Sequence, residues 1–398
     1  MKRPFALIGI TYLSVQAALF YLESDLAAAI LTAVCFIGTI VSLFILKNRN
    51  LRHTVLGFCL TAAFASTIFS GYNIFVKQPI VDKYSEREIY VTATVLEQPT
   101  VQYDTYRYLI ETDSINGKIE KLKICLSTIN ELNVEEFDRI SCVLPLKECT
   151  KSQMIADGAF LQASVNKNFA YIVKKTDDKP LYYQAVKIRE NFADSFEQNM
   201  SQDCASLCRA VLLGEKTALS QEIQNDFTRC GVSFLIVVSG MHLAIISSFV
   251  FLCIKKIIKN RVLRSMIMLM CAFSFMAVTG FAPSVVRAGV MLAVVYSGKM
   301  FMRKGDSLNS LGIAALILTV PNPTAVADVG MLLSFTATLG IILWARKISV
   351  YIMGKFAKLK RLKKPVEFTV NLFAVSVSAA VWTMPISVLM FGKVSVFS

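Results

Sequence analysis

Charged residues, histidine and tryptophan are all scarce in this sequence. Asp, Glu, Lys and Arg together make up 18% of the 398 residues, whereas an ordinary soluble domain has about a quarter. Apolar residues make up 55%, and the mean hydropathy is +0.54. They are clustered, since a stretch such as Leu311–Val320 contains no charge. This composition excludes a soluble globule, a disordered chain and a collagen, and it indicates a multi-span membrane protein.

Motifs for several kinds of chemistry are also missing. The only histidines are His53 and His242, with no HExxH motif, so no metal site is expected. The segment Gly214-Glu215-Lys216-Thr217 lacks the upstream glycine of a phosphate loop, and Glu215 separates its glycine from its lysine, which argues against an ATPase. We therefore expect neither an enzyme nor a cofactor. If the protein needs energy, it must come from a partner or a gradient.

The ten cysteines contain no CxxC pair, which argues against a zinc finger or a thioredoxin-type site. Six of them lie in or beside the long polar stretch, where a disulfide could persist outside the cell. These six are Cys125, Cys142, Cys149, Cys204, Cys208 and Cys230. An unreactive core thiol is the commoner fate of a cysteine, and it explains Cys142 and Cys149 as well. The sequence leaves both interpretations open.

The positions of the basic residues indicate the membrane topology. Of the 42 Lys and Arg residues, 21 lie in the short segments 2–3, 47–52, 255–264, 299–304 and 346–364, whereas loops 22–25, 282–284 and 321–327 have none. By the positive-inside rule, the N-terminus and the basic loops face the cytoplasm. The polar stretch Lys77–Asp203 has 16 basic and 20 acidic residues and faces outward. The net charge of +14 therefore says little about nucleic-acid binding.

About 20 apolar helical residues are needed to cross a bilayer. On that criterion we expect nine spans, within one either way. They are Phe5–Leu22, Leu26–Leu46, Thr54–Val76, Gly231–Ile254, Ser265–Phe281, Val285–Met302, Leu308–Val320, Val329–Ala345 and Phe368–Val394. The start of the chain also resembles a signal peptide, but it has no clean small-x-small cleavage site, so we favour a retained first helix.

The outward stretch divides into a β part and a helical part. Short alternating runs predict strands at Ile89–Glu97, Tyr106–Thr112, Lys118–Ser127, Arg139–Leu146 and Gly158–Val165. Asn116-Gly117 predicts a hairpin turn. Such strands favour a small closed barrel, with an OB-like topology as one possibility. Leu181–Arg229 has a helical pattern, with Ser220 as N-cap and Glu222 in the first turn.

We therefore predict a polytopic α-helical membrane protein with an inserted, exported small β-barrel domain of OB-like type. Its predicted parts are three N-terminal membrane helices (1–76), the exported barrel (77–180), exported amphipathic helices (181–230) and a second membrane domain (231–398).

Ser239 and His242 are three residues apart in an apolar run, which predicts that they share one helix face. One interpretation is the serine–histidine dyad of an intramembrane protease, but nothing in the sequence supplies an oxyanion hole or an orienting group. The favoured interpretation is a polar seam against another helix, with Gly240 allowing close approach.

Arg287 lies just inside an apolar span, where an unpaired charge is costly. It is near the outer end of that span, so its side chain could snorkel to the interface. Asp328 is predicted at the same edge, so the two residues could form a pair. The sequence favours neither alternative over the other.

Two segments that flank the start of the second membrane domain form a recognisable pattern. They are Ala210-Val-Leu-Leu-Gly-Glu-Lys216 and Phe227-Thr-Arg-Cys-Gly-Val-Ser-Phe-Leu-Ile-Val-Val-Ser-Gly-Met-His-Leu243, followed later by Pro283-Ser-Val-Val-Arg-Ala288, Pro323–Asp328 and Gly330–Ile341. Together they resemble the competence domain of the ComEC family. The segments occur in the family's order, and the N-terminal spans and exported barrel also fit.

The resemblance implies a channel in the bacterial inner membrane that passes transforming single-stranded DNA into the cytoplasm. It implies partners as well: single-stranded DNA, membrane lipid, the DNA receptor and the ATPase or helicase of the competence machinery, with a homo-oligomer left open. The positions that match the family's motifs would line or pack the DNA path. They are Gly231, Ser239, Gly240, His242, Arg287, Asp328, Gly330, Ser334 and Phe335.

The chain departs from the family in three respects. Phe234 and Leu332 stand where the family has His and Gln, and the metallo-β-lactamase-like domain of larger members is not present, so we expect a C-terminally incomplete chain. The alternatives are a small-solute transporter and a truncated, non-conducting remnant of the channel. Within the barrel, the best cluster for stacking DNA bases is Tyr103, Tyr106, Arg107 and Tyr108, although a plain barrel surface is the favoured interpretation of these residues.

Overall fold

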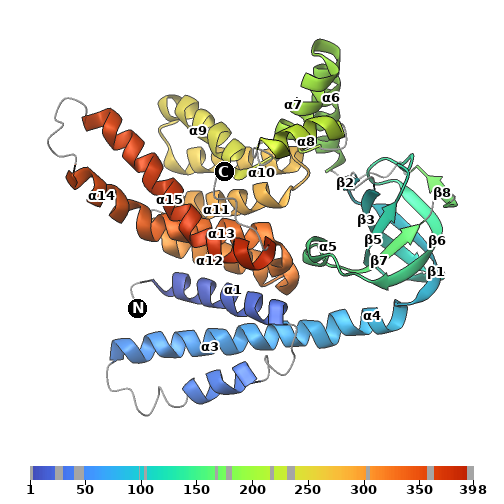
Figure 1. Ribbon diagram of the computed structural model, residues 1–398, viewed down its shortest axis with the longest axis horizontal. Helices are drawn as coiled ribbons and strands as arrows, with labels where there is room; N and C mark the ends of the chain where they lie inside the picture. The colour runs from blue at the N-terminus through green and yellow to red at the C-terminus, as the bar shows by residue number, and fades with distance from the viewer. Residues whose placement is uncertain are drawn as a thin grey trace. The chain divides into compact units, whose positions relative to one another are not determined.

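The computed structural model describes most of the chain and separates it into two compact units. The described residues are 3–22, 30–39, 49–97, 99–102, 105–165, 169–175, 182–215, 219–230, 238–301, 305–355 and 363–391. Unit 1 comprises Met1–Thr67, Ser297–Pro321 and Asp328–Ser398, and unit 2 comprises Ile68–Tyr296 and Asn322–Ala327. Figure 1 labels their helices and strands.

Six helices in the described part of the chain are long and apolar enough to cross a membrane. They are Pro4–Leu22, Leu51–Tyr84, Gly240–Ile257, Arg261–Val278, Val329–Lys355 and Val366–Met390. Many of their large apolar side chains are exposed, for example Phe249, Met270 and Leu389. Soluble proteins rarely expose so large an apolar surface to water, so this surface faces lipid. The prediction of a multi-span membrane protein is confirmed.

The other three predicted spans also contain helix where the structure describes them. Ile30–Thr39 and α12 (Ser307–Thr319) are apolar but shorter than a full span. Helix α11 (Pro283–Met300) covers the predicted span Val285–Met302. Six of the nine predicted spans thus correspond to helices that are long and apolar enough to cross a membrane. The other three correspond to helices that are not among those six.

The described residues of unit 1 form helices joined by short loops. It contains α1 (Pro4–Leu22), the first part of α3 (Arg49–Tyr72), α12, α13 (Val329–Gly340), η5 (Ile341–Ala345), α14 (Arg346–Lys355) and α15 (Lys363–Phe391). Helices α1 and α12 pack together through small residues, and Arg3 Nε lies 2.7 Å from the Asp306 carboxylate beside their N-terminal ends. On the other side, Trp344 and Trp382 make an edge-to-face contact between η5 and α15, with ring centroids 5.7 Å apart.

Helix α3 continues further than the sequence predicted. It passes through η1 (Asn73–Lys77) into α4 (Gln78–Tyr84), so the apolar helical run Leu51–Tyr84 has 34 residues. At 1.5 Å per residue this run is about 50 Å long, whereas the hydrocarbon core is about 30 Å thick. The predicted span ending at Val76 is therefore the membrane part of a longer helix, which leads directly into the barrel.

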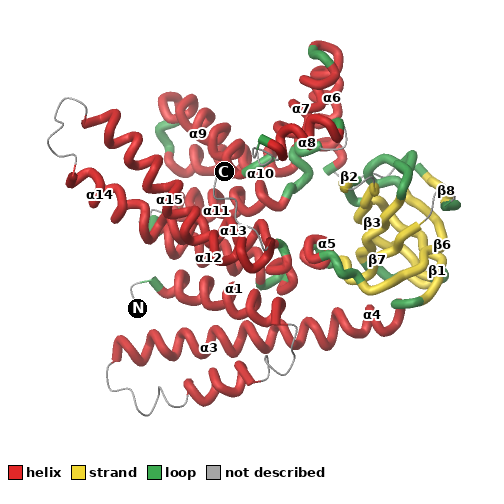
Figure 2. The backbone as a smooth tube through the Cα atoms, in the orientation of Figure 1, coloured by secondary structure: helices red, strands yellow, loops and turns green. Residues whose placement is uncertain are grey.

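The barrel is built from five principal strands and three short ones. The strands are β1 (Arg87–Val95), β2 (Thr100–Gln102), β3 (Thr105–Ile115), β4 (Lys118–Ile119), β5 (Lys123–Thr128), β6 (Arg139–Glu148), β7 (Ala159–Val165) and β8 (Tyr171–Lys174). The ring runs β1-β3-β5-β7-β6 and closes because β6 pairs with β1 (Figure 2). Among the strand pairs of the described residues, β5 and β7 alone are parallel. This confirms the small closed barrel, in the Greek-key arrangement of an OB-like domain.

The interior of the barrel is apolar, as the alternation predicted. Ile110, Ile124, Leu144 and Leu161 are fully buried in it. At the predicted hairpin, Asn116 and Gly117 both have positive φ, 49° and 80°. Two successive positive φ angles are those of a type I′ turn, so the prediction from Asn-Gly is confirmed.

The predicted strand Lys118–Ser127 is interrupted in the structure, so that prediction was wrong in its continuity. Strand β4 ends at Ile119 and β5 begins at Lys123. The side chain of Thr112 on β3 spans the break: its Oγ1 donates to the Glu120 carbonyl at 2.6 Å and accepts from the Leu122 N–H at 2.9 Å. Because that hydroxyl satisfies backbone groups at the break, the strand can bend there.

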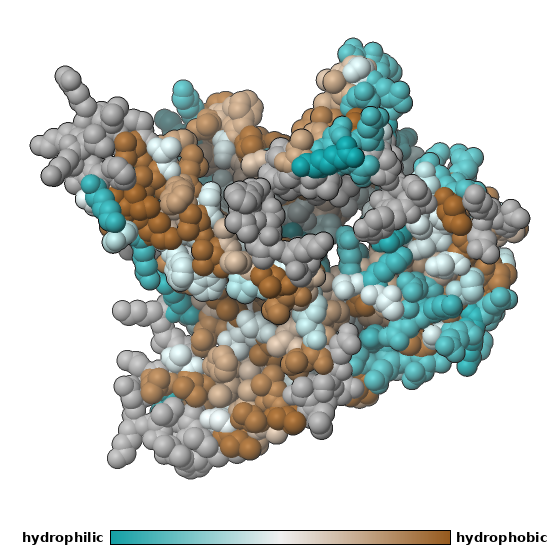
Figure 3. Space-filling view, in the orientation of Figure 1, coloured by the Kyte–Doolittle hydropathy of each residue, from teal (hydrophilic) through white to brown (hydrophobic). Residues whose placement is uncertain are grey.

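The helical segments of unit 2 follow the barrel. They are α6 (Tyr183–Asn199), α7 (Gln202–Cys208), η2 (Arg209–Leu213), α8 (Gln221–Arg229), α9 (Gly240–Ile257), α10 (Arg261–Val278) and α11. Ser220 Oγ accepts from the Ile223 N–H at 3.3 Å, which confirms it as the N-cap of α8. In Figure 3 the surface over the barrel and α6 is mainly hydrophilic, whereas the surface of unit 1 is mainly hydrophobic.

Candidate functional site

Ser239 and His242 are in contact, and together they cap the N-terminus of helix α9. Ser239 has extended backbone angles and precedes α9, which begins at Gly240. His242 Nδ1 accepts from the Ser239 backbone N–H at 3.1 Å and lies 3.1 Å from Ser239 Oγ. This is the arrangement of a capping box, with histidine in place of the usual Glu or Gln at the third helical position.

The prediction of a shared helix face, and of a helix already formed from Gly231, was therefore wrong at Ser239. Ser239 lies outside the helix, and residues 231–237, including Gly231 and Phe234, fall outside the described residues. The histidine nitrogen that faces the serine is occupied by a backbone N–H. That geometry argues against the nucleophile–base pair of a protease.

Gly240 lets the start of α9 approach the start of α11 closely. A Cβ on Gly240 would lie 2.7 Å from the Cβ of Ala288. In the same contact, Ser284 Oγ donates to the Val238 carbonyl at 2.6 Å. Leu243 and Val285 are fully buried alongside. This agrees with the favoured interpretation of a close helix contact at a glycine, with polar groups at the starts of the two helices.

The segment Ala210–Glu215, which precedes α8, packs near the same contact. Gly214 ends η2 in the left-handed conformation, with a φ of 88°. A Cβ added there would lie 3.6 Å from both the Thr279 carbonyl oxygen and Val238 Cγ2. The segments Ala210–Glu215, Val238–Gly240 and Thr279–Ser284, which are far apart in the sequence, therefore converge in unit 2. The first two segments, and Pro283-Ser284 at the end of the third, are parts of the pattern by which the sequence resembles a family.

Asp328 has a structural role that the sequence reasoning missed. It is the N-cap of α13, and its Oδ1 accepts from the Gly330 N–H at 2.8 Å. An aspartate two residues before a glycine at the start of an apolar run is a capping signal that could have been recognised. Further along α13, Leu332 and Phe335 are buried and Ser334 is half-buried. Phe335 and Leu332 are thus packing residues.

Arg287 lies on α11 one turn beyond Ser284 and is half-buried. Asp328 belongs to unit 1 and Arg287 to unit 2. The predicted choice between a pair and snorkelling stays a prediction.

The stacking cluster on the barrel needs correction. Tyr108 is 1% exposed in the barrel core, and its hydroxyl oxygen accepts from the Leu132 N–H at 2.8 Å. Burial raises its pKa to about 12. Tyr106 is half-buried against the same core, and Tyr103 lies outside the described residues. Because residues i and i+2 of a strand share a face, Tyr106 and Tyr108 point inward and only Arg107 points outward.

Arg107 lies on the outer face with a second cation. It is directly opposite Ser127 on β5, and Lys151 Nζ donates to Ser127 Oγ at 3.1 Å. Burial raises the pKa of the neighbouring Cys125, and the charges of Lys151 and Arg107 oppose that rise. In OB-like barrels, nucleic acid binds the outer face of the second and third strands beside the loop between strands four and five. Here these are β3, β5 and the loop that carries Lys151 and α5 (Ser152–Ala156).

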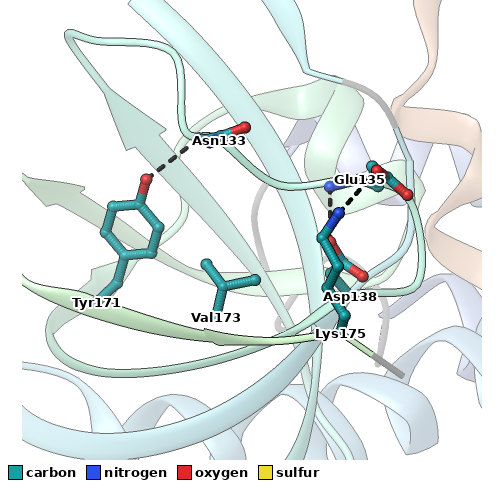
Figure 4. Close-up of a pocket in the computed structure, with 6 residues that line it drawn as sticks. All are labelled: Asn133, Glu135, Asp138, Tyr171, Val173 and Lys175. Carbon is teal, nitrogen blue, oxygen red and sulfur yellow. Dashed lines mark hydrogen bonds and ion pairs between the residues drawn. The ribbon is translucent and has the colours of Figure 1, made fainter. Parts of the chain in front are cut away.

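A shallow hollow of about 410 Å³ lies elsewhere on the barrel (Figure 4). Its lining residues are Asn133, Glu135, Asp138, Tyr171, Val173 and Lys175. Asp138 Oδ2 accepts from the Glu135 N–H at 3.0 Å, and Lys175 Nζ lies 3.2 Å from the Glu135 carboxylate. Two carboxylates face one ammonium group there, so the hollow would repel a phosphate backbone.

The cysteines form no disulfide among themselves, and all ten lie in the described residues. Cys142 and Cys149 are buried free thiols, which confirms the core interpretation. Burial raises the pKa of Cys142 to about 12. Within the described ranges, no three His, Cys, Asp or Glu side chains are grouped so that they could hold a metal ion.

Fold and site together define a polytopic α-helical membrane protein with an inserted closed β-barrel and a convergence of three motif segments at the start of α9 and α11. Comparison with known proteins extends this. Residues 211–398 match the family described as Competence protein. The chain is also 24% identical over 161 residues to ComE operon protein 3 of Bacillus subtilis (strain 168), an alignment covering 40% of this chain and 21% of that protein.

Residues 211–398 are therefore a competence domain, and the similarity to ComE operon protein 3 also supports a competence protein of the ComEC family. Its alignment spans about a fifth of the length of the curated relative. No solved structure matches the chain.

Proposed function

We propose that this chain passes a single strand of transforming DNA through the bacterial inner membrane into the cytoplasm. The observation that carries the proposal is the convergence of Ala210–Glu215, Val238–Gly240 and Thr279–Ser284 in the part of the chain that matches the competence family. A role in DNA uptake follows from the family, and the channel itself is the proposal.

The chemistry of this convergence suits a polyanion. Helices α9 and α11 both begin there, and the N-terminus of a helix carries a partial positive charge that favours phosphate. Ser239, His242 and Ser284 add polar groups at the outer ends of otherwise apolar helices. We place the N-terminus in the cytoplasm and the barrel outside, so the strand would meet these helix starts from the outer side.

The barrel would receive the strand before it reaches the membrane. Arg107 and Lys151 supply two cations on the face where OB-like barrels hold nucleic acid. The sequence contains no complete phosphate loop. A receptor that delivers the DNA and an ATPase or helicase that drives it would then be separate partners in the same membrane.

A transformation assay tests the proposal. A naturally transformable strain without its own ComEC protein would express the full chain, and labelled DNA that becomes resistant to external nuclease would be counted. We expect internalised single-stranded DNA and transformants above the deletion background. A chain that inserts normally but internalises no DNA would contradict the proposal. Uptake of a small solute without DNA would instead support the transporter alternative.

A further inference from the structure

Arg189 on α6 is a buried cation that joins three separate segments of unit 2. The residue is 5% exposed, and its guanidinium donates to the carboxylate of Glu136, which is 7% exposed. Its Nε lies 3.1 Å from Oε1 of Glu215, which is 5% exposed. Glu136 belongs to the barrel, between β5 and β6, and Glu215 follows η2. Burial alone would lower the pKa of Arg189, but Glu136 and Glu215 outweigh it and raise the pKa, so the side chain stays charged.

A second arginine extends this contact. Arg209 holds Oε2 of Glu215 through Nε and Nη2, each at 2.9 Å, and also pairs with Glu197 at the end of α6. With Arg189 removed, Glu215 would therefore keep a partner, whereas Glu136 would be a buried carboxylate without one. Such a stranded charge is strongly unfavourable.

A chain of aromatic rings runs beside the ion pairs. The Phe137 ring lies 5.8 Å from Tyr182, and the Tyr182 ring lies 5.4 Å from Phe281 in the turn between α10 and α11. Phe137 and Phe281 have positive φ angles of 69° and 52°. A bulky residue persists in that conformation only where its surroundings impose it, and such positions are frequent in switch regions.

The guanidinium of Arg189 also touches the turn itself. Gly280 has a φ of 66°, and a Cβ there would lie 2.9 Å from Nη1 of Arg189. Arg189 is thus packed against the backbone that leads into α11, the helix whose start meets Gly240 and Val238. We call Glu136, Phe137, Tyr182, Arg189, Glu215, Gly280 and Phe281 the junction.

We propose that Arg189 is a positioning residue that couples the barrel to the α10–α11 turn, so that a strand held on the barrel is aligned with the start of α9 and α11. The DNA-uptake test of this proposal rests on the proposed function. If Arg189 had only a structural role, its loss would lower the amount of folded protein and nothing more. A variant that folds normally without the ionic contact therefore distinguishes a structural role from a positioning role.

The double variant Arg189→Met/Glu136→Gln separates the two roles. The methionine removes the cation, and the glutamine removes the carboxylate that would otherwise be stranded, while Glu215 retains Arg209. Lys175→Met is the matched control, because it breaks an ion pair with the adjacent Glu135 in the same domain, but an exposed one. If the single variant Arg189→Met fails to accumulate, the double variant still decides the question.

Hydrogen exchange followed by mass spectrometry, on full-length protein in detergent, gives the first readout. In the double variant we expect the amides of both 136–138 and 279–282 to exchange faster by roughly tenfold. In Lys175→Met the turn 279–282 should be unchanged. Unchanged exchange at 279–282 in the double variant would overturn the coupling, whatever happens to DNA uptake.

DNA uptake per inserted molecule gives the second readout. We expect the double variant to lose most of its uptake at a normal protein level, and Arg189→Lys, which keeps the charge but not the forked contact, to retain part of it. Normal uptake in a double variant with faster exchange at the turn would overturn the positioning role. If even the unmodified chain takes up no DNA, the proposed function fails, and hydrogen exchange still decides whether the junction couples the barrel to the turn.

Discussion

Gly9 of α1 and Gly312 of α12 lie against each other with no room for a side chain on either. A Cβ on Gly9 would overlap the backbone carbonyl of Gly312, and a Cβ on Gly312 would overlap the backbone of Phe5 and Ala6. Small residues at such crossings let membrane helices pack by van der Waals contact, since lipid provides no hydrophobic drive between them. This contact joins the first helix of the chain to one almost three hundred residues later.

Substitution of either glycine should therefore separate α1 from α12. For Gly9→Ala and Gly312→Ala we expect a loss of about 1–3 kcal/mol of stability, since the new methyl group meets backbone, which cannot move aside as a side chain can. Thermal unfolding of purified protein measures it. Gly298→Ala on α11 is the matched control, because nothing lies within 4 Å of a Cβ there. Equal melting temperatures for all three variants would contradict the close packing.

The capping box at α9 makes a second prediction. His242→Leu removes the acceptor of the Ser239 N–H and should cost about 1 kcal/mol, whereas His242→Gln supplies the usual capping-box acceptor and should preserve stability. We expect His242→Leu to insert but to reduce DNA uptake, and His242→Gln to retain uptake. A stable His242→Gln variant without uptake would mean that the imidazole itself acts on the strand, beyond its role as a cap.

The barrel and the membrane helices could be predicted from the sequence because their patterns are local. Alternation predicted the strands that carry Ile110 and Ile124, both of which lie inside the barrel, and Asn116-Gly117 predicted its hairpin. Closure of the ring depends on the pairing of β1 with β6, about fifty residues apart, which no local pattern specifies. The break before β5 depends on the Thr112 hydroxyl of another strand and was missed for the same reason.

The candidate site was predicted in part, and the family resemblance contributed more to that prediction than residue spacing and composition did. Ser239 and Gly240 were identified, but a three-residue spacing does not reveal whether a serine lies inside a helix or caps it. Tyr108 was assigned to a stacking surface because a tyrosine in a strand has the same sequence signature on either face. Arg189 was not identified at all, since its partners Glu136 and Glu215 become neighbours only in the folded chain.

Native cysteines provide a third prediction, on topology and burial together. Cys204 at the start of α7 is exposed, whereas Cys142 is a buried barrel thiol whose pKa is raised to about 12 by burial. A raised thiol pKa leaves Cys142 protonated and unreactive up to pH 9. In intact cells, a membrane-impermeant maleimide should label a variant whose only cysteine is Cys204 and should not label one whose only cysteine is Cys142.

Denaturation is the control for the cysteine experiment, since both variants should react once unfolded. Labelling of Cys204 only after the membrane is permeabilised would reverse the orientation that the basic loops predict. Labelling of native Cys142 would contradict the packing of the barrel.

The last prediction concerns the outer face of β3 and β5. Arg107 lies directly opposite Ser127 in the strand register, and Lys151 Nζ donates to Ser127 Oγ, so a single-stranded DNA backbone on this face would contact both cations. In fluorescence anisotropy with a labelled oligo-dT and the full chain in nanodiscs, Arg107→Ala and Lys151→Ala should each weaken binding. Each should also lower the slope of log affinity against log salt by about 0.7, the value for one phosphate contact on a single strand.

The matched control is Lys118→Ala, which removes an exposed lysine in the β3–β4 hairpin and should change neither the affinity nor the salt slope. An unchanged salt slope for both Arg107→Ala and Lys151→Ala would remove this face from the DNA path.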